Sequence, residues 1–414
     1  MAPGKSIAVI GAGIIGAHVA LRLQADGHSV VLYDPETPGM GCSFGNGGYI
    51  ATDEVLPLAR PELLASVPWM LLNPAAPFTV HWPSVPGLMP WFVHFARACG
   101  SKQVARGTSV MSRLMKATPA AWAEAAKLAK LGPLLKASGF LRVFESKAGI
   151  RKFQHELKVQ KAHDVPVEIL ARAAVLKRLP GLTPAVKGGL YYPEGRHLAD
   201  PHRVVERLVI AFKKRGGVFE RQPVRAFTRS QTHLTAVRSA GGRQNIDAVV
   251  VAAGIASGRL LAKLGVNLPL TAERGYHVMM DGHIPGFETP FVSVERGMII
   301  TPMSIGTRFA GTVEFARSGV PPTSRRADKL LRSGRELFPK IQIREKSRWM
   351  GERPTLPDYL PAIGPLQDIK NLYVATGHQH LGVTLGAVTA KIIAGMINGE
   401  ENPNWEALAP DRFG

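Results

Sequence analysis

A short glycine-rich stretch near the N-terminus constrains this sequence more than any other feature. Residues 7–16 read Ile-Ala-Val-Ile-Gly-Ala-Gly-Ile-Ile-Gly, an apolar run of strand length that turns through three glycines into an apolar helix. Gly11 permits a tight turn, Gly13 lets the backbone approach a pyrophosphate, and Gly16 lets the helix pack against the strand. A pyrophosphate would lie on the free N–H groups of the helix N-terminus. The stretch therefore predicts a dinucleotide-binding βαβ unit.

The next residues complete this unit. Gly27 ends the predicted helix, and a second strand is expected over residues 29–33. Asp34 closes that strand, 23 positions after Gly11, where a carboxylate can accept hydrogen bonds from ribose hydroxyls. Three glycines alone also occur in ordinary buried turns, so the interpretation depends on the complete order of strand, glycines, helix, strand and acid.

A second glycine-dense stretch, residues 35–48, follows directly. It cannot form a core of its own, but it lets the backbone lie flat against a ligand. Ser43 and Asn46 are its polar groups that could hydrogen-bond a flat heterocycle or a phosphate. The alternative is an ordinary flexible linker.

Composition limits the classes of protein that remain. With 414 residues the chain exceeds the usual size of one core, so two domains are expected. The chain is 45% hydrophobic and 20% charged, as in soluble globular proteins. Its two cysteines, Cys42 and Cys99, are too few for a disulfide framework or a zinc site, so we expect free thiols in a reducing compartment and no metal centre.

The charge balance is strongly basic. Lys and Arg total 51 against 31 acids, a net charge of +20. No arginine-rich tract or nucleic-acid motif concentrates this charge, so we expect no nucleic-acid partner and favour a peripheral contact with anionic lipid. The apolar stretch 381–397 is interrupted by Lys391 and small residues, and no secretory signal precedes the glycine motif. We expect a cytoplasmic protein, with peripheral contact at the inner face of the cell membrane as the alternative.

The segment 57–98 is dense in prolines and contains apolar, aromatic turns around Trp69 and Trp91. Its pattern predicts irregular structure, either a lid or a surface that touches a partner or membrane. The alternative, which we favour, is that the aromatics pack inside the second domain. Residues 109–136 are expected to be helical, with a break or a new first turn at Pro119.

Later segments return to a β-α-β pattern. Asp200 and Pro201 predict the start of a helix that runs to about residue 214. Strands are expected over 140–144, 218–226, 248–253, 276–280, 297–300 and 372–376. The nucleotide domain is therefore discontinuous. We expect it to comprise residues 1–56, 191–265 and 346–414, and the second domain to comprise 57–190 and 266–345.

The C-terminal block carries a further glycine turn. A strand ends at Gly377 and a final helix opens near Gly382 and runs to about residue 398. Helix-terminus N–H groups aimed at a ligand favour developing negative charge.

The sequence resembles the FAD-dependent D-amino acid oxidase/dehydrogenase superfamily in five segments. They are the motif GAGIIG with its strand-end acid, Cys42–Gly48, Asp247–Gly254, Arg353–Gly364 and Gly377–Thr384. Among its members, bacterial D-amino acid dehydrogenases and their hydroxyproline- and opine-oxidising relatives are the most similar. The resemblance covers nearly the whole chain. It implies a mixed α/β fold, in which a discontinuous, Rossmann-like FAD-binding domain of the glutathione-reductase type joins a substrate domain built on an antiparallel or mixed sheet plus helices.

The motifs and the resemblance imply non-covalent FAD and a set of cofactor-binding residues. These are Gly11, Gly13, Ile14, Ile15, Gly16, Asp34, Cys42, Ser43, Asn46, Gly47, Gly48, Val224, Ala253, Gly254, Arg353, Gly377, His378, Leu381, Gly382, Val383 and Thr384.

The resemblance also implies the chemistry. Hydride transfer from the Cα–H of a D-amino acid to flavin N5 would give an imino acid, then a keto acid, or a cyclic imine if the substrate resembles D-proline or hydroxy-D-proline. Arg353 would clamp the substrate carboxylate, with help from the phenol of Tyr276. His380 is the third expected catalytic residue; His277 and His378 are further candidates for deprotonating the amine, although each is more often a packed histidine.

Two departures from relatives leave the substrate identity open, Cys42 in the second glycine stretch and the sequence of residues 274–277. The electron acceptor is also open between a quinone, another acceptor and oxygen, the last making the protein a soluble oxidase. A flavin-binding subunit of a multi-subunit opine- or secondary-amine-oxidising complex is the alternative function.

Overall fold

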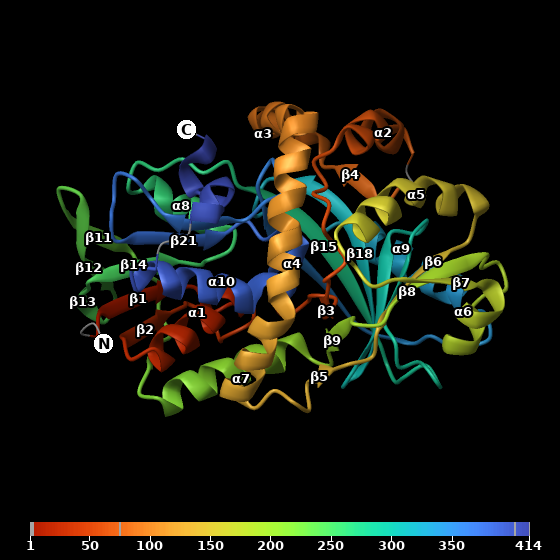
Figure 1. Ribbon diagram of the computed structural model, residues 1–414, viewed down its shortest axis with the longest axis horizontal. Helices are drawn as coiled ribbons and strands as arrows, with labels where there is room; N and C mark the ends of the chain where they lie inside the picture. Colours follow the sequence, from red (N-terminus) through yellow and green to blue (C-terminus); the bar gives the residue numbers. More distant parts are fainter. Residues whose placement is uncertain (1–3, 74–75, 401–402, 414) are drawn as a thin grey trace.

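The computed structural model describes residues 4–73, 76–400 and 403–413, so the predicted domain limits at residues 1 and 414 lie outside it. Two β-sheets lie side by side, and the long helix α4 (Ser101–Ala129) crosses the molecule at their junction (Figure 1). The mixed α/β fold predicted from the sequence is confirmed.

The smaller sheet contains the N-terminal motif. Its strand order is β10-β2-β1-β14-β21-β20, and its neighbouring strands run parallel except β20, which is antiparallel to β21. The strands are β10 (Val218–Glu220), β2 (Ser29–Tyr33), β1 (Ser6–Ile10), β14 (Ala248–Val251), β21 (Leu372–Thr376) and β20 (Ala362–Pro365). The expected βαβ unit is thus confirmed at the centre of a parallel sheet.

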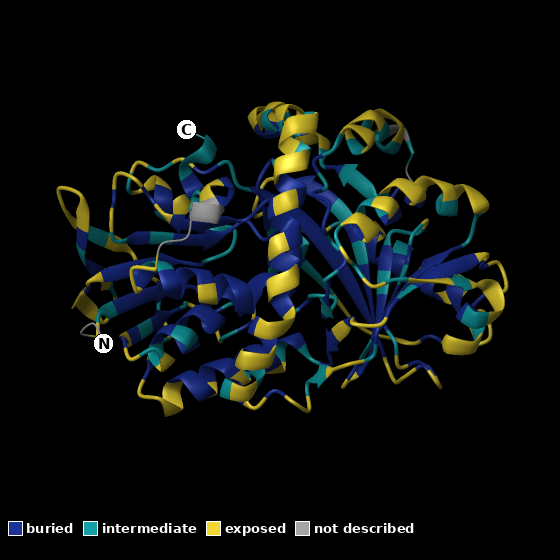
Figure 2. Ribbon diagram, viewed as in Figure 1, coloured by how far each residue is buried: buried dark blue, intermediate teal, exposed yellow. Residues whose placement is uncertain are grey.

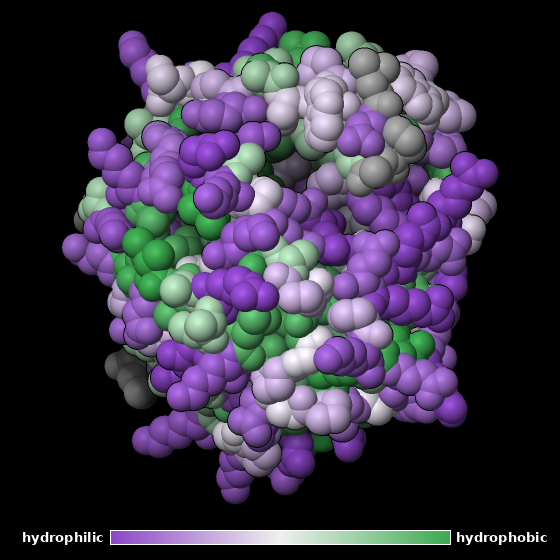
Figure 3. Space-filling model, turned by 90° about the vertical axis from the view of Figure 1, so that its right-hand side faces the viewer, coloured by the Kyte–Doolittle hydropathy of each residue, from purple (hydrophilic) through white to green (hydrophobic). Residues whose placement is uncertain are grey.

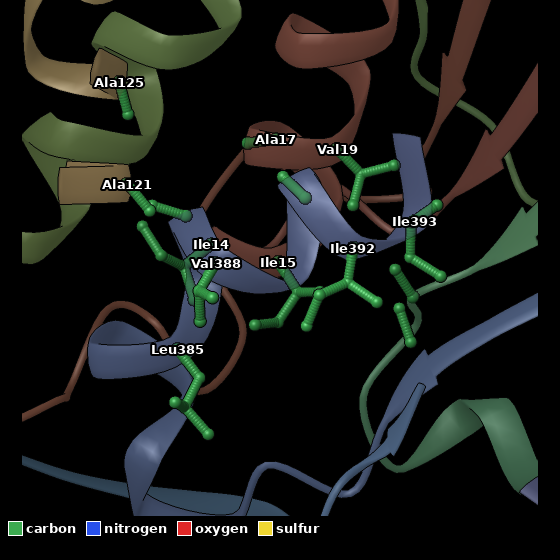
Figure 4. Packing of buried hydrophobic residues seen from close by; sticks show 14 of the residues in the cluster. Ile14, Ile15, Ala17, Val19, Ala121, Ala125, Leu385, Val388, Ile392 and Ile393 are labelled. Atoms are coloured by element: carbon green, nitrogen blue, oxygen red, sulfur yellow. The ribbon is translucent and has the colours of Figure 1, made fainter. Parts of the chain in front are cut away.

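Four helices cover one face of this sheet. They are α1 (Ile14–Ala25), α10 (Gly382–Ile397), α7 (Pro201–Lys214) and α4. Figure 4 shows Ile14 and Ile15 of α1 beside Val388 and Ile392 of α10, within a buried core to which α4 also contributes. The other face is covered by α8 (Ala256–Ala262) and a three-stranded sheet of β11 (Ala226–Ser230), β12 (His233–Ser239) and β13 (Gly242–Asn245).

The larger sheet follows the order β19-β15-β18-β17-β16-β6-β8-β7, with β4 beside β18. It is mostly antiparallel. The strands are β19 (Glu345–Thr355), β15 (Thr271–Met280), β18 (Gly306–Ala316), β17 (Met298–Met303), β16 (Phe291–Ser293), β6 (Phe140–Phe144), β8 (Gly188–Tyr192), β7 (Glu168–Ala171) and β4 (Phe78–Val80). One face packs on α9 (Ser324–Leu337), and the other is turned toward the smaller sheet.

Remaining elements join or cover the two sheets. A small sheet of β3 (Tyr49–Ile50), β9 (Arg196–Leu198) and β5 (Leu135–Lys136) lies between them. Helices α5 (Lys147–Ala162) and α6 (Arg172–Arg178) flank the far end of the larger sheet, where hydrophobic residues are scattered in small groups among hydrophilic ones (Figure 3). Short 3-10 turns are η1 (Trp82–Ser84), η2 (Gln379–Leu381), η3 (Pro403–Leu408) and η4 (Pro410–Phe413).

The expected helix break at Pro119 is wrong. Helix α4 runs without interruption for 29 residues through this proline. Its inner stripe, including Leu114 and Trp122, is buried against α10 and α7, while its outer face is exposed (Figure 2). Burial on both sides of the proline holds the helix together, because packing can offset one missing N–H.

The expectation of irregular structure over 57–98 is also wrong. Two helices form there, α2 (Pro61–Leu72) and α3 (Val85–Ala98). Each has a proline in its first turn, where no N–H donor is needed, and each also continues through an interior proline, Pro68 in α2 and Pro90 in α3. The aromatics divide: Trp91 is buried, whereas Trp69 and Trp82 are 64% and 65% exposed. The favoured alternative, burial of the aromatics, therefore holds for Trp91 and also for Phe95, but not for Trp69 and Trp82.

The two sheets divide the chain somewhat differently from the predicted domains. Strand β19 pairs along its length with β15 in the larger sheet, although residues from 346 onward were expected in the nucleotide domain. Helix α4 packs on the helices of the smaller sheet, although residues 57–190 were expected in the other domain. The division into domains remains a prediction.

One helical stretch of the described chain, Gln379–Ile397, is long and apolar enough to cross a membrane. Within its most apolar window 72% of the residues are buried inside the protein. A helix in a protein core has the same properties, so this is weak evidence for a membrane span.

Candidate functional site

A cavity of about 940 Å³ lies between the carboxyl ends of the parallel strands and the inner face of the larger sheet. Clefts at this place in α/β sheets commonly bind ligands. Most of the predicted site residues line it: Gly11, Gly13, Ile14, Ile15, Asp34, Cys42, Ser43, Asn46, Gly47, Val224, Ala253, Gly254, Tyr276, Arg353, His378, His380, Leu381, Gly382, Val383 and Thr384. Gly16, Gly48 and Gly377 do not line it and act through backbone geometry.

The first glycine turn leaves no room for side chains at Gly11 and Gly16. Gly11 has a φ of +108°, and a Cβ on it would lie 2.4 Å from the carbonyl oxygen of Ala252. A Cβ on Gly16 would lie 1.8 Å from the Gly11 oxygen, so helix and turn could not approach as they do. A Cβ on Gly13 would meet only the Ser43 hydroxyl, at 3.4 Å, which leaves open space in front of the turn. This is a cradle of the size and polarity that a pyrophosphate needs.

Asp34 is held rigidly at the end of β2. Its Oδ2 accepts a hydrogen bond from Ala12 N at 2.7 Å, and its Oδ1 accepts one from Glu36 N at 2.9 Å. Burial raises the pKa of this carboxyl, and the two backbone N–H groups oppose the rise. Carboxylate lone pairs remain available, so the predicted role of Asp34 toward ribose hydroxyls stays a prediction.

The second glycine stretch lies against the first turn. Ser43 Oγ accepts a hydrogen bond from Ile14 N at 2.9 Å, at the start of α1. Asn46 Oδ1 accepts one from Gly48 N at 2.8 Å. Cys42 Sγ donates to the Glu352 carbonyl at 2.7 Å, and burial raises the pKa of this thiol to about 12. A protonated, hydrogen-bonded thiol is a poor nucleophile, which is consistent with a non-covalent cofactor.

Side chains of the larger sheet hold this stretch in place. A Cβ on Gly45 would lie 2.0 Å from the Trp349 ring, so only glycine fits beneath the indole. The indole stacks on the His277 imidazole with ring centroids 5.3 Å apart. Arg308 and Thr301 donate hydrogen bonds to carbonyl groups of the stretch. Trp349, Arg308 and Thr301 had no signal in the sequence, because they lie hundreds of residues from the loop they hold.

The C-terminal glycine turn points α10 at the cavity. Gly377 has a φ of +78°, and a Cβ there would lie 2.5 Å from a Leu356 methyl group. Gly382, Val383 and Thr384 form the first turn of α10 and line the cavity. Thr384 Oγ1 accepts a hydrogen bond from Ala51 N at 2.9 Å. A helix N-terminus here favours negative charge in the cavity, as predicted.

Arg353 lines the cavity from the edge strand β19. Its Nη1 lies 3.0 Å from Oε1 of the buried Glu273. Glu273 also accepts hydrogen bonds from the hydroxyls of Thr355 at 3.3 Å and Tyr359 at 3.0 Å. A Cβ on Gly275 would lie 2.1 Å from Arg353 Nη2, so the guanidinium lies across this glycine. One carboxylate fixes the guanidinium, and its other N–H groups remain for a ligand carboxylate.

The Tyr276 phenol does not lie beside the Arg353 guanidinium, although both were expected at the substrate carboxylate. Tyr276 pairs with Met350 across the strands, whereas Arg353 pairs with Glu273, so alternation along β15 puts the phenol and the guanidinium on opposite faces. The phenol donates to Glu314 Oε2 and accepts from Thr323 N at 3.1 Å. Although the residue borders the cavity, its phenol packs in the core beneath α9, which turns the hydroxyl away from a carboxylate held by Arg353.

The three histidines differ in position. His277 and His378 are buried, and burial lowers the pKa of each to about 3. His378 Nε2 lies 2.9 Å from the Thr389 hydroxyl, and His277 Nδ1 lies 3.2 Å from the Gly45 carbonyl oxygen, so each ring has a hydrogen-bond partner within the protein. His380 is half-buried at the cavity; burial lowers its pKa, which the carboxylates of Glu54 and Glu273 partly oppose.

Glu54 is a cavity residue that the sequence did not reveal. Its Oε1 accepts a hydrogen bond from Arg142 Nη2 at 2.6 Å, and the same guanidinium donates to the buried Asp53 at 2.6 and 3.0 Å. Burial raises the pKa of Glu54, but Arg142 and His380 outweigh that effect and lower it. A carboxylate therefore faces the cavity near His380. Within the described ranges, no group of three or more His, Cys, Asp or Glu could hold a metal ion.

Comparisons with known proteins agree with this geometry. Residues 6–396 match the family model described as FAD dependent oxidoreductase. The chain is 31% identical to a D-amino-acid oxidase of Bradyrhizobium diazoefficiens over 97% of both chains, and 28% identical to a D-amino acid dehydrogenase of Granulibacter bethesdensis over 96% of both. The crystal structure of glycine oxidase from Geobacillus kaustophilus shares the fold, with a TM-score of 0.77, 21% identity and 99% of each chain covered. The chain therefore belongs to the FAD-dependent oxidoreductase family.

Proposed function

We propose that the protein oxidises the Cα–N bond of a D-amino acid, with FAD lying across the two glycine stretches and the substrate bound at Arg353. One observation carries the proposal: a guanidinium fixed by a buried carboxylate faces the same cavity as two helix N-termini and the pyrophosphate cradle. Similarity to D-amino acid oxidase and dehydrogenase along nearly the whole chain supports this substrate class.

The FAD-binding roles follow from the contacts. The N–H groups at the start of α1, other than that of Ile14, which donates to Ser43, bind the pyrophosphate, and Asp34 accepts hydrogen bonds from the ribose. The 42–48 stretch and the first turn of α10 line the flavin end, where the α10 N-terminus favours negative charge. FAD, when bound, supplies the hydride acceptor that no side chain can provide.

The substrate-binding roles follow from charge. Arg353 holds the carboxylate and so orients Cα, which contributes most when the geometry is close to that of the reaction. Loss of a hydride from Cα leaves an imino acid, which water hydrolyses to a keto acid, or a cyclic imine if the amine belongs to a ring. His380 is neutral at neutral pH and lies at the cavity, so among the three histidines it is the candidate acceptor of an amine proton.

An anaerobic screen tests the reaction. The yellow holoenzyme is mixed with D- and L-amino acids, including proline derivatives, and the flavin absorbance is followed. We expect bleaching by one or more D-amino acids. A flavin that no amino acid bleaches would instead favour the alternative of a flavin-binding subunit in a larger complex.

We further propose a dehydrogenase that works at the inner face of a membrane and passes electrons to a quinone or a related acceptor. The support is the exposure of five apolar side chains on α2, η1 and α3, together with the net charge of +20. These side chains are Leu64, Trp69, Trp82, Met89 and Val93. Each basic residue near an anionic surface contributes about 1 kcal/mol.

Flotation with anionic liposomes at low and high salt tests the membrane contact. Replacing both Trp69 and Trp82 with Ser should abolish flotation, whereas Ile169→Ser, at another apolar residue that is 67% exposed, should not. Dye reduction should exceed peroxide formation on the same substrate. Fast peroxide formation without liposome binding would identify a soluble oxidase.

A further inference from the structure

The larger sheet holds four consecutive carbonyl groups of the flavin-lining loop, residues 44–47. Arg308 Nη1 donates to the oxygens of Phe44 at 3.1 Å and Asn46 at 2.6 Å. His277 Nδ1 lies 3.2 Å from the Gly45 oxygen, and Thr301 Oγ1 donates to the Gly47 oxygen at 2.7 Å. Each carbonyl group of the loop is thus held by a side chain of the larger sheet, while Gly45, Asn46 and Gly47 line the cavity.

The donors come from three adjacent strands. Thr301 on β17 pairs directly with Arg308 on β18, and β15 beside them carries His277. Directly paired residues share one face of a sheet, so the donors form one surface beneath the loop. This surface, unlike a glycine turn, exists only when the larger sheet is correctly paired.

Arg308 brings an unbalanced charge to this surface. It is 4% exposed, its hydrogen bonds go to carbonyl oxygens, and within the described part of the chain no carboxylate lies at ion-pair distance from it. Burial lowers the pKa of its guanidinium to about 10, which keeps it protonated at neutral pH. The carboxylate of Asp200, which lies beyond ion-pair distance, raises this pKa and so partly opposes the effect of burial. Burying a cation without a paired anion costs free energy of folding, and groups of this kind are concentrated at functional sites.

We propose that Arg308 is a positioning residue that fixes the 44–47 loop against FAD and that its charge, acting through this loop, favours the reduced cofactor. The inference rests on the FAD placement given under the proposed function. Reduced FAD carries more negative charge than oxidised FAD at neutral pH, so a nearby cation in a low-dielectric site raises the midpoint potential.

The midpoint potential of bound FAD tests the charge. It is measured anaerobically on the holoenzyme by reduction with dithionite beside a reference dye, which requires no amino acid. Arg308→Met should lower the potential so that the reduced-to-oxidised ratio falls at least about tenfold, equivalent to about 30 mV for two electrons. Arg308→Lys keeps the charge and should keep most of the potential while binding FAD more weakly. If the Met variant retains no FAD, Arg308→Gln, which is uncharged but has amide donors, replaces it.

Thr301→Val is the matched control, because it removes one carbonyl hydrogen bond from the same loop without changing charge. It should weaken FAD binding and leave the potential unchanged. An unchanged potential in a flavin-loaded Arg308→Met or Arg308→Gln variant would overturn the inference, as would an equal shift in Thr301→Val. Failure of amino acids to bleach the flavin would count against the proposed reaction and not against this inference.

Discussion

The two sheets that enclose the cavity contribute different kinds of chemical group. The smaller, parallel sheet supplies mainly backbone: glycine turns, helix N-termini and one strand-end acid. The larger, antiparallel sheet supplies side chains from its inner face, including Arg353, Glu273 and Arg308. The first group is formed within short segments, whereas the second depends on strand pairing between distant segments. Substitutions in the two sheets should therefore impair different properties of the protein.

The largest effect is expected at the glycine turn of the smaller sheet. In Gly16→Val the new Cβ would overlap the Gly11 oxygen, which belongs to the backbone and cannot move aside. The free energy of unfolding should fall by about 4–5 kcal/mol or more, the upper end for single substitutions, and FAD should be lost. Urea unfolding and FAD content measure both. Gly132→Ala, where a Cβ meets nothing within 4 Å, should be harmless; equal damage there would show that the turn is not special.

The next effect is expected in the larger sheet. Arg142→Met would leave the buried carboxylate of Asp53 without its cation, and Glu54 beside it. Breaking such a pair costs about 3–5 kcal/mol. The comparison variant is Arg348→Met, whose partners Glu345 and Asp328 lie at the surface and contribute at most about 1 kcal/mol. Urea unfolding of both variants should reveal the contrast, and similar values would argue against a tightly buried cluster.

A kinetic effect without loss of cofactor is expected at Arg353. A lysine ammonium in Arg353→Lys cannot form two parallel hydrogen bonds to a carboxylate while it also contacts Glu273. The expected loss is about 2–4 kcal/mol in kcat/KM, mostly through KM, with FAD content nearly unchanged. Steady-state kinetics on a D-amino acid found by the screen provides the measurement. Normal kinetics in a flavin-loaded variant would remove Arg353 from the substrate site.

The smallest effect, when counted for each pH unit, is a dependence of stability on pH. His18 is buried in the core of the smaller sheet, and burial lowers its pKa from 6.5 to about 3. Below pH 6.5 His18 takes up a proton in the unfolded chain but stays neutral in the folded protein. The free energy of unfolding therefore decreases as the pH falls to about 3. His18 contributes about 1.4 kcal/mol per pH unit to this decrease over most of that range. Urea unfolding of His18→Leu between about pH 6 and pH 4 should show a shallower slope than wild type. The exposed His155→Leu should keep the wild-type slope, and identical slopes in all three proteins would contradict the assignment.

These contrasts explain what could be predicted from the sequence. The glycine turn, the strand ending at Asp34 and the helix capped by Asp200 were predicted correctly, because each depends on neighbours within a few residues. The break at Pro119 was wrong because packing on α7 and α10 decides whether that helix continues. The prolines of 57–98 led to a wrong prediction for a related reason, since some of them begin helices there and Pro68 and Pro90 lie inside helices.

The larger sheet was less predictable. Arg353 was recognised through its proline-rich surroundings and the family resemblance, and it does line the cavity. The expected meeting of the Tyr276 phenol with Arg353 is not seen, because a residue's face follows from strand register, which the sequence does not give. Glu54, Trp349 and Arg308 were missed, since their partners are brought close only by the fold.

The most direct test of the account is a single-turnover reaction of the holoenzyme with the two enantiomers of its best amino acid, under anaerobic conditions. Flavin bleaching and the oxidised product are measured together, with hydrogen or deuterium at Cα. The account predicts that the D-enantiomer bleaches the flavin, yields one keto acid or cyclic imine per FAD, and reacts more slowly when deuterated. Bleaching by the L-enantiomer alone, or no bleaching by any amino acid, would contradict it.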